Sequence, residues 1–431
     1  MGILKMHYGK GYLNIDTEKI GDYRVLDKDI YVENGQNEIV TRALNNPIGS
    51  PSLKDIVKSG DKVCLVISDI TRYYQRMDIF LPLIIRELNS GGVKDKNIVI
   101  LSATGAHKKQ TEEEHKLLLG EALSIRFQVI DHNCHDKDNL IYFSKTKCGT
   151  PIEINRHAIE CNHLILTGAV TYHDMSGYGG GRKSLLPGIA SYEAVSSNHM
   201  RVFGEKEGSG INPYCKLGNL YRNPMHEDMM EACDTINPSF IFNVILDSKG
   251  NYYKAVAGNY KEAFEKGVQY CDEVGAVHVD EKADVVIASA GGYPKDINLY
   301  QAAKAHSSSI EALKDGGTLI VIAQCPDNMG AQESVDIIMD YENNRDRERF
   351  MRKTFIPEAY SGYLICQISS KYRVILVSDY EDNEDNEVII KSGMKHFRDL
   401  DEALKYAYAD RNDLFTYVVP NASAILPKKW L

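Results

Sequence analysis

The chain has 431 residues, of which 43% are hydrophobic and 26% charged, and its formal net charge is −10. This length predicts two domains, and the composition is typical of a soluble globular protein. The acidic balance leaves no basic excess to neutralise phosphates, so it excludes a general nucleic-acid binder. No apolar run reaches the roughly 18 residues of a membrane span, so we expect no membrane partner. Nine scattered cysteines without a CxxC pair indicate reduced thiols in a cytoplasmic protein.

Apolar, β-branched runs alternate with helical patterns through the first half of the chain. We expect strands at 61–69, 96–105, 125–131 and 162–170, and helices at 80–92, 111–123 and 191–203. Thr111 and Glu114 have the spacing of a capping box at the start of the second of these helices. Strands that alternate with helices predict an α/β fold with a largely parallel sheet.

The pattern changes at 240–258, where two apolar runs flank a Ser-Lys-Gly turn and predict a hairpin, followed by a helix at 260–274. The alternation then restarts. We expect strands at 283–292, 318–325 and 372–379, with helices at 300–317 and 401–412. This organisation predicts a domain over 1–277 and a second over 278–411, each with a largely parallel sheet flanked by helices. The tail, 412–431, either completes the first domain or finishes the second sheet.

Polar side chains that can bind or react follow several predicted strands. Ligands of parallel sheets bind beyond the carboxyl ends of the strands. Arg72, His107 and His173 follow strands of the first domain, and Lys304 and its neighbours follow the strand at 283–292. Any one of these residues has a simple interpretation as a surface side chain, but agreement among four loops favours function. The sequence therefore predicts an active site in a cleft between the domains.

The stretch HDMSGYGGGRKSLLPG, residues 173–188, is the richest in glycine. It fits neither a phosphate-binding P-loop nor a dinucleotide fingerprint, because Arg182 stands where each requires glycine. A loop remains that lets backbone approach a ligand, with Arg182 and Lys183 projecting from it. With His107 and His173, His199 suggests a metal site or a proton-transfer site, and the residues alone leave both open. The close spacing of a zinc hydrolase motif is missing.

Four blocks carry a resemblance to a known family: SDITR (68–72), ATGAHKKQTEEE (103–114), residues 173–199 and GGYPKDINLYQAAK (291–304). On these blocks the chain resembles the lactate racemases that use a nickel-pincer nucleotide. The resemblance implies an isomerase that inverts C2 of a 2-hydroxy acid by reversible hydride transfer. It also implies the cofactor, a pyridinium-3-thioamide-5-thiocarboxylic acid mononucleotide with Ni(II), and separate biosynthetic enzymes that make it.

The same resemblance implies roles for individual residues. Lys183 would form a thioamide bond to the cofactor and His199 would bind nickel. His107 and His173 would be the acid/base pair. Arg72 and Lys304 would hold the substrate carboxylate. The remaining implied site residues are Gln301 and Tyr300 toward the substrate, and Asp69, Ser176, Gly177, Gly179 and Gly180 toward the cofactor.

The sequence departs from the family pattern where substrate shape is decided. Lactate-specific members carry a tryptophan in the second domain, whereas the only tryptophan here is Trp430 and the corresponding region offers Tyr360 and Tyr363. Tyr73 and Tyr74 replace a proline-containing turn. These changes favour a 2-hydroxy acid other than lactate, such as a larger sugar acid. Two alternatives stay open: a zinc-dependent lyase or hydrolase that uses the same histidines, and a non-catalytic protein that binds a nucleotide or a hydroxy acid.

Overall fold

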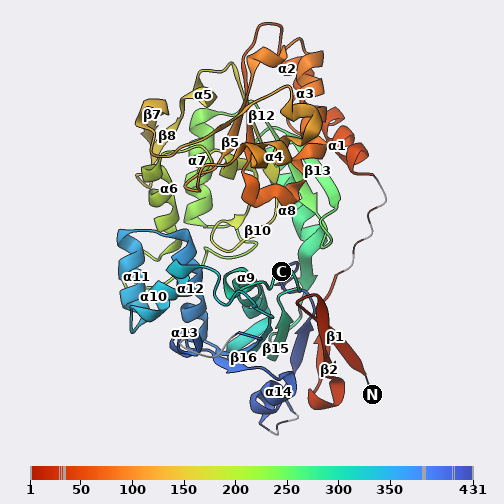
Figure 1. Ribbon diagram of the computed structural model, residues 1–431, viewed down its shortest axis with the longest axis vertical. Helices are drawn as coiled ribbons and strands as arrows, with labels where there is room; N and C mark the ends of the chain where they lie inside the picture. The colour runs from red at the N-terminus through yellow and green to blue at the C-terminus, as the bar shows by residue number, and fades with distance from the viewer. Residues whose placement is uncertain are drawn as a thin grey trace. The chain divides into compact units, whose positions relative to one another are not determined.

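The computed structural model describes residues 2–28, 30, 32, 35–380, 385–409, 411 and 413–429 (Figure 1). The chain forms two compact units. The first unit comprises residues 30–202 and 214–274, and the second comprises 1–29, 203–213 and 275–431. Within the described ranges, no helix combines the length and the apolar character needed to cross a membrane.

A six-stranded sheet organises the first unit, in the order β13-β12-β9-β4-β5-β6. All neighbours are parallel except β12 and β13, which form the predicted antiparallel hairpin. The strands are β4 (Val63–Ser68), β5 (Ile98–Ala103), β6 (Val129–Asp131), β9 (His163–Ala169), β12 (Phe240–Leu246) and β13 (Tyr252–Gly258). The predicted strands are therefore confirmed, although β6 is shorter than the apolar run that predicted it.

Helices and two small hairpins surround this sheet. The helices are α1 (Gln36–Asn45), α2 (Leu53–Ile56), α3 (Met77–Ser90), α4 (Glu112–Ser124), α5 (Arg156–Ile159), α6 (Tyr192–His199), α7 (Pro224–Ile236) and α8 (Glu262–Gly275). Thr111 and Glu114 form the predicted capping box of α4. The hairpins, which the sequence pattern did not reveal, are β7 (Leu140–Lys145) with β8 (Pro151–Asn155), and β10 (Tyr172–His173) with β11 (Gly177–Tyr178).

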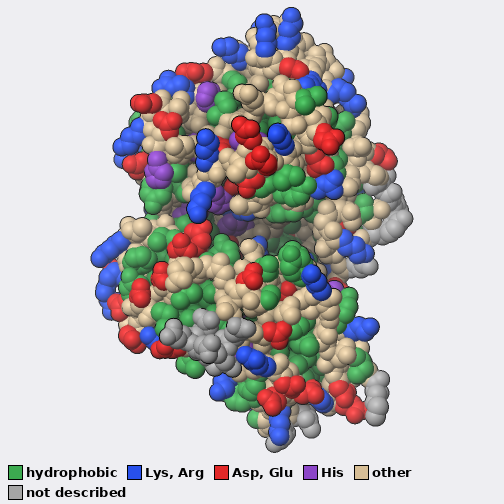
Figure 2. All heavy atoms as spheres, viewed as in Figure 1, with side chains coloured by type: hydrophobic (Ala, Val, Ile, Leu, Met, Phe, Trp, Pro, Cys, Tyr) green, Lys and Arg blue, Asp and Glu red, His purple; other side chains and the backbone are tan. Residues whose placement is uncertain are grey.

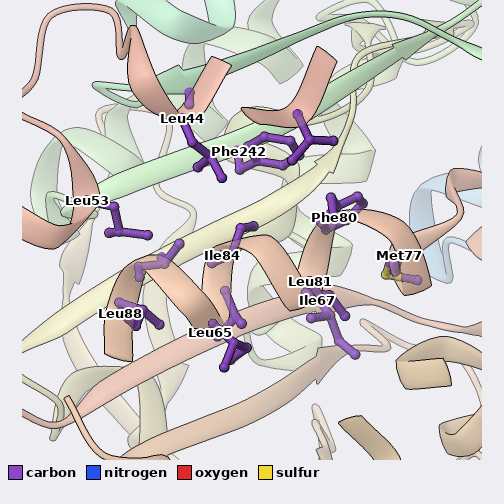
Figure 3. Close-up of a cluster of buried hydrophobic side chains, with 14 of the residues drawn as sticks. Leu44, Leu53, Leu65, Ile67, Met77, Phe80, Leu81, Ile84, Leu88 and Phe242 are labelled. Atoms are coloured by element: carbon purple, nitrogen blue, oxygen red, sulfur yellow. The ribbon is translucent and has the colours of Figure 1, made fainter. Parts of the chain in front are cut away.

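The core of the first unit forms where α3 packs on the sheet (Figure 3). Leu65 and Ile67 of β4 belong to the same cluster as Leu81 of α3. The Phe80 and Phe242 rings lie 5.1 Å apart. Alternate β4 residues point to opposite faces, and the strand is buried on both. This double burial explains why β4 reads as a continuous apolar run.

The second unit contains a fully parallel six-stranded sheet in the order β18-β17-β16-β15-β19-β3. Its strands are β3 (Tyr23–Val25), β15 (Ala283–Ser289), β16 (Leu313–Ile322), β17 (Arg373–Val377), β18 (Lys395–Phe397) and β19 (Thr416–Val419). Its helices are α9 (Leu299–Ser309), α10 (Gln332–Met339), α11 (Asn344–Lys353), α12 (Pro357–Ser369), α13 (Asp385–Lys391) and α14 (Leu400–Tyr408).

The helix predicted over 300–317 is too long. It ends as α9 at Ser309, and β16 already begins at Leu313. Gly316 and Gly317, which were expected at the end of the helix, lie within β16, and glycine is a poor helix former. The α/β class with largely parallel sheets is confirmed in both units.

Both ends of the chain belong to the second unit, which differs from the expected domains 1–277 and 278–411. Strand β19 from the tail pairs with β15, so the tail finishes the second sheet. Strand β20 (Leu426–Lys428) pairs with β14 (Ala276–His278). The hairpin of β1 (Ile3–Tyr8) and β2 (Gly11–Asp16) also joins this unit, because Ser289 donates a hydrogen bond to the His7 carbonyl, 2.5 Å away. Trp430 lies outside the described residues.

Candidate active site

The first group of predicted site residues lies directly after β4, in the 3₁₀ helix η2 (Ile70–Gln75). Asp69 caps this helix, and its Oδ1 accepts hydrogen bonds from the backbone N–H and the hydroxyl of Thr71, at 3.2 and 2.5 Å. The Arg72 side chain is exposed, and its Nη1 donates to the Thr71 hydroxyl at 3.0 Å. Tyr73 and Tyr74 are also exposed, at 45% and 48% of their surface.

His107 follows β5 and meets this loop. Its Nδ1 hydrogen-bonds to Oδ2 of Asp69, whose side chain is buried. Burial raises the pKa of Asp69, but the hydrogen bonds from His107 and Thr71 outweigh it and leave this pKa below its ordinary value. The Asp69 carboxylate is therefore ionised at neutral pH and is held between Thr71 and His107.

Gln110, which the sequence reasoning did not single out, ties the two loops together. Its Oε1 accepts a hydrogen bond from the Ile70 N–H at 2.6 Å, and its Nε2 donates to Ser102 and to Asp131, at 2.8 and 2.7 Å. The Gln110 backbone N–H also donates to Asp131. The side chain is buried, so these contacts fix the loop that carries His107 against the loop that carries Asp69. No local pattern marks such a residue.

His173 ends β10, opposite Gly177 of β11. Its Nδ1 accepts hydrogen bonds from the backbone N–H groups of Met175 and Ser176, at 3.2 and 3.4 Å. The Asp174 carboxylate lies 3.1 Å from the same nitrogen. Burial lowers the pKa of His173 well below its ordinary value, and positive charge on Lys183 and Arg72 lowers it further.

Lys183 lies in the 3₁₀ helix η5 (Gly181–Ser184), which contacts β4, β9 and β12. Its Nζ donates to the hydroxyl of Ser176 at 3.5 Å. Burial lowers the pKa of Lys183 to about 7, and the charges of Arg182 and Arg72 contribute to this shift, whereas Asp174 opposes it. A large fraction of this amine is therefore neutral at pH 7, which is the form that acts as a nucleophile.

Arg182 turns into the protein, contrary to the expectation that it projects from the loop. It is only 1% exposed. Its guanidinium donates to the carbonyls of Ser176, Gly179 and Gly180, at 2.9, 3.4 and 3.3 Å, and lies 4.4 Å from the centre of the Phe264 ring. Arg182 thus holds the glycine loop in shape from inside, because the surrounding backbone oxygens would otherwise lack these donors.

The packing of the protein itself explains two of the glycines. Gly177 has a φ of 77°, and a Cβ there would collide with the backbone of Asn219. Gly180 has a φ of 72°, and a Cβ there would collide with Asn243 and with the Ala169 carbonyl. Both positions combine a left-handed backbone with a close approach that only glycine tolerates. At Gly179 a Cβ would approach the hydroxyl of Thr171 to 3.1 Å.

His199 lies at the end of α6 and is 7% exposed. Its Nδ1 hydrogen-bonds to the Val195 carbonyl at 2.8 Å. Burial lowers the pKa of His199 to about 4, and the charge of Lys183 adds to the effect. The ring is therefore neutral at pH 7, and the bond to Val195 places the proton on Nδ1. This arrangement is typical of a histidine whose Nε2 binds a metal.

Within the first unit, several predicted site residues lie close enough to one another to affect each other's pKa. The charges of Lys183 and Arg72 each lower the pKa of His173, and the nearby His199 lowers it when it is protonated. The charges of Lys183 and His107 each lower the pKa of His199. Within the described parts of the chain, no three His, Cys, Asp or Glu side chains form a metal site on their own. One protein ligand suffices where a bound organic group supplies the other donors.

A hollow of about 1070 Å³ borders His107 in the same unit. Its lining includes Gln110, which follows β5, His115 of α4 and Asp131 of β6. His115 and Asp131 are paired at 2.8 Å. Figure 2 shows histidine side chains reaching the surface of this unit among acidic and basic ones.

The other predicted site residues belong to the second unit. Tyr300, Gln301 and Lys304 lie on the first turns of α9, where Asn298 caps the helix and Lys304 donates to Gln301 at 3.4 Å. Tyr360 and Tyr363, in α12, are at most 2% exposed and pack in an aromatic cluster with Phe355. These two tyrosines therefore belong to the core of their unit.

Comparison with known proteins gives a consistent result along the whole chain. Residues 8–210 match the lactate racemase N-terminal domain, and residues 279–426 match the lactate racemase C-terminal domain. A lactate racemase from Thermoanaerobacterium thermosaccharolyticum is 33% identical, with all of both chains covered. A lactate racemase from Lactiplantibacillus plantarum is 32% identical, with 91% of each chain covered.

Solved structures agree with this result. The lactate racemase apoprotein from T. thermosaccharolyticum superposes with a TM-score of 0.87 at 32% identity, covering 99% of this chain and 100% of that one. A protein from Thermotoga maritima shares the fold, with a TM-score of 0.61 at 17% identity, covering 93% of this chain and 100% of that one. From the two domain matches and the full-length relatives, the chain belongs to the lactate racemase family and is an isomerase.

Proposed function

We propose that this protein inverts C2 of a 2-hydroxy acid by reversible hydride transfer, with His107 and His173 as the acid/base pair. The observation that carries the proposal is the grouping of two differently held histidines with Lys183, Arg72 and His199 in one unit. The curated relatives, which are lactate racemases, support the same reaction class.

The side chains divide the work by their chemistry. Arg72, which is exposed and cationic, binds the substrate carboxylate. Fixing the carboxylate holds C2 in a reactive position. One histidine accepts the hydroxyl proton of the substrate. The other histidine returns a proton to the carbonyl oxygen of the planar 2-keto acid, and the configuration at C2 is inverted when the hydride returns to the opposite face of C2.

The residues of the first unit fit a nickel-pincer nucleotide. Lys183 offers an amine that is partly neutral at pH 7, and His199 offers a neutral imidazole with its proton on Nδ1. Lys183 would hold the group covalently, and His199 would bind its nickel through Nε2. When bound, the group would supply the acceptor for the hydrogen at C2. Ser176, which contacts Lys183, and the backbone at Gly179 would lie beside it.

The substrate differs from lactate in this proposal. Tyr73 and Tyr74 follow Arg72 directly, and their exposed rings and hydroxyls offer contacts that a methyl group cannot use. We therefore propose a larger or more polar 2-hydroxy acid, such as a sugar acid.

The test is a panel of single-enantiomer 2-hydroxy acids, lactate and sugar acids included, offered to protein co-expressed with the enzymes that make the cofactor. Chiral chromatography should detect inversion of at least one acid. His107→Gln and His173→Gln should each lower inversion by more than the factor of roughly 10²–10⁴ that one acid/base group supplies. Inversion that persists in either variant contradicts the two-histidine scheme. Metal analysis separates the zinc alternative, since the proposal requires nickel.

A further inference from the structure

We propose that the two histidines are held in opposite neutral tautomers, and that Asp69 and Asp174 are the positioning residues that give each histidine its proton state. Asp69 keeps the proton of His107 on Nδ1. Backbone N–H groups keep the proton of neutral His173 on Nε2, and Asp174 accepts the additional Nδ1 proton when His173 becomes charged. This inference rests on the proposed acid/base roles.

The tautomer of His107 follows from its partner. An ionised carboxylate only accepts hydrogen bonds, so the Nδ1 that meets Asp69 must carry a proton. The Nε2 of neutral His107 then has a lone pair. His107 is therefore ready to accept the hydroxyl proton of a substrate without any rearrangement.

The tautomer of His173 follows from the opposite kind of partner. Two backbone N–H groups, those of Met175 and Ser176, point at its Nδ1. A nitrogen that accepts hydrogen bonds carries no proton, so the proton of the neutral ring is on Nε2. In this state His173 donates a hydrogen bond from Nε2 and cannot accept a proton there.

Catalysis requires His173 to leave this resting state. To release the Nε2 proton to a 2-keto acid, the ring must first hold a second proton on Nδ1, because the alternative product is an imidazolate anion. To accept a proton on Nε2 in the reverse direction, the neutral ring must likewise carry its proton on Nδ1. Both working states therefore place a proton on the nitrogen that the backbone amides now occupy.

Asp174 is the group placed to accept that proton in a hydrogen bond. Its Oδ1 lies 3.1 Å from Nδ1 of His173 and 3.1 Å from the Met175 N–H, which also contacts Nδ1. The Met175 N–H is thus shared between two acceptors, and a small movement can direct its hydrogen bond wholly to Asp174 or wholly to Nδ1 of His173. The cations around His173 otherwise oppose its protonation, since Lys183, Arg72 and Arg182 all lower its pKa. Asp174 is the carboxylate adjacent to the ring.

Nitrogen-15 NMR of the cofactor-free protein, with ¹⁵N-labelled histidine, tests the assignment directly. The chain has 13 histidines, and His107→Gln and His173→Gln identify the two signals by their loss. We expect a proton on Nδ1 for His107 and on Nε2 for neutral His173. The same tautomer in both rings would overturn the proposal, whatever the loaded enzyme does.

The carboxylates have separate signatures in the same measurement. Asp69→Asn should move the His107 proton toward Nε2, since an amide can donate to Nδ1, and should leave His173 unchanged. Asp174→Asn should lower the pH at which His173 gains its second proton by at least about one unit, because an opposite charge at this distance is worth about 1–3 pKa units. Asp174→Glu should restore most of that shift. An unchanged midpoint in Asp174→Asn removes Asp174 from the scheme.

Single-turnover kinetics of the loaded enzyme complete the test. The equilibrium constant of the inversion fixes the ratio of kcat/KM in the two directions, so a variant must change both values by the same factor and kcat/KM cannot separate the histidines. The rate at which 2-keto acid forms from each enantiomer, measured by trapping it, can separate them. Asp69→Asn should slow its formation from one enantiomer, and Asp174→Asn from the other. Equal slowing of both enantiomers in each variant contradicts the separate roles. If the loaded wild-type protein inverts none of the acids, the proposed function is contradicted, but the tautomers measured by NMR are not affected.

Discussion

Asp69 binds His107 with one carboxylate oxygen and Thr71 with the other, so both of its oxygens are engaged within the protein. The resemblance to the family implied that Asp69 lies toward the cofactor. Its contacts within the protein join the capping of η2 to the orientation of His107. A turn that begins a short helix therefore also holds an acid/base side chain, and the contact depends on two loops that follow neighbouring parallel strands.

Lys183 should react as an unusually acidic lysine. Its pKa of about 7 lies below the ordinary value, so its neutral fraction should rise through pH 7 and level off by about pH 9. Competitive acetylation of the cofactor-free protein, followed by peptide mass analysis, measures this profile, with the exposed Lys54 as internal reference. A Lys183 profile that follows that of Lys54 up to pH 10 would show that the amine is not perturbed.

Lys183 should also be the point of covalent attachment. Intact-mass analysis of cofactor-loaded protein should show an adduct that disappears in Lys183→Ala and persists in Lys109→Ala, in which an exposed lysine is removed. An undiminished adduct in Lys183→Ala would place the attachment elsewhere.

His199→Ala should lose nickel while keeping the adduct, because one of four coordination bonds disappears and the bond to Lys183 remains. Metal analysis of the purified variant against His278→Ala, an exposed histidine of the second unit, makes the comparison. Full nickel content in His199→Ala would mean that another group completes the site.

Leu81→Ala should destabilise the first unit by about 2–5 kcal/mol, the range for a buried leucine whose removal leaves a cavity. Leu81 is fully buried between α3 and the sheet (Figure 3). Leu117→Ala on α4 is the matched control, since that side chain is 52% exposed. Urea unfolding should separate the two variants clearly. Equal effects would contradict the packing of α3.

Acid should weaken the fold through buried neutral histidines. Burial lowers the pKa values of His132 and His306 to about 4. Between pH 6.5 and 4 the unfolded chain therefore binds more protons at these positions than the folded protein, so stability falls as the pH falls through this window. His306→Gln cannot titrate and should lose less stability between pH 7 and pH 5 than wild type, by about 1 kcal/mol or more. If the free energy of unfolding falls equally between pH 7 and pH 5 in His306→Gln and in wild type, His306 is not a source of the acid sensitivity.

The sequence revealed what depends on local pattern. The strands of the first sheet, strands β15, β16 and β17 of the second, the hairpin of β12 and β13 and the capping box at Thr111 follow from periodicity and spacing over a few residues. Pairings across long separations do not. Strand β3 joins β19 although about 390 residues separate them in the chain, and only the folded sheet makes that pairing visible. The domain limits were misplaced at the N-terminus for this reason.

The same distinction holds at the site. Arg72, His107 and His173 could be predicted because the ends of parallel strands are general sites of ligand binding. Gln110 could not, since its three partners come from separate strands and loops. Nor could the inward turn of Arg182, because a basic residue after glycines is usually solvated, and only the carbonyls of the folded loop draw it inside.

The fate of the hydrogen at C2 tests the central claim most directly. A single enantiomer of the best substrate, deuterated at C2, is incubated with cofactor-loaded protein in ordinary water, and the opposite enantiomer is isolated and its mass measured. Transfer as hydride predicts that the product keeps its deuterium at C2. Replacement of the deuterium by hydrogen from the solvent would show that C2 is deprotonated instead, and would contradict the account.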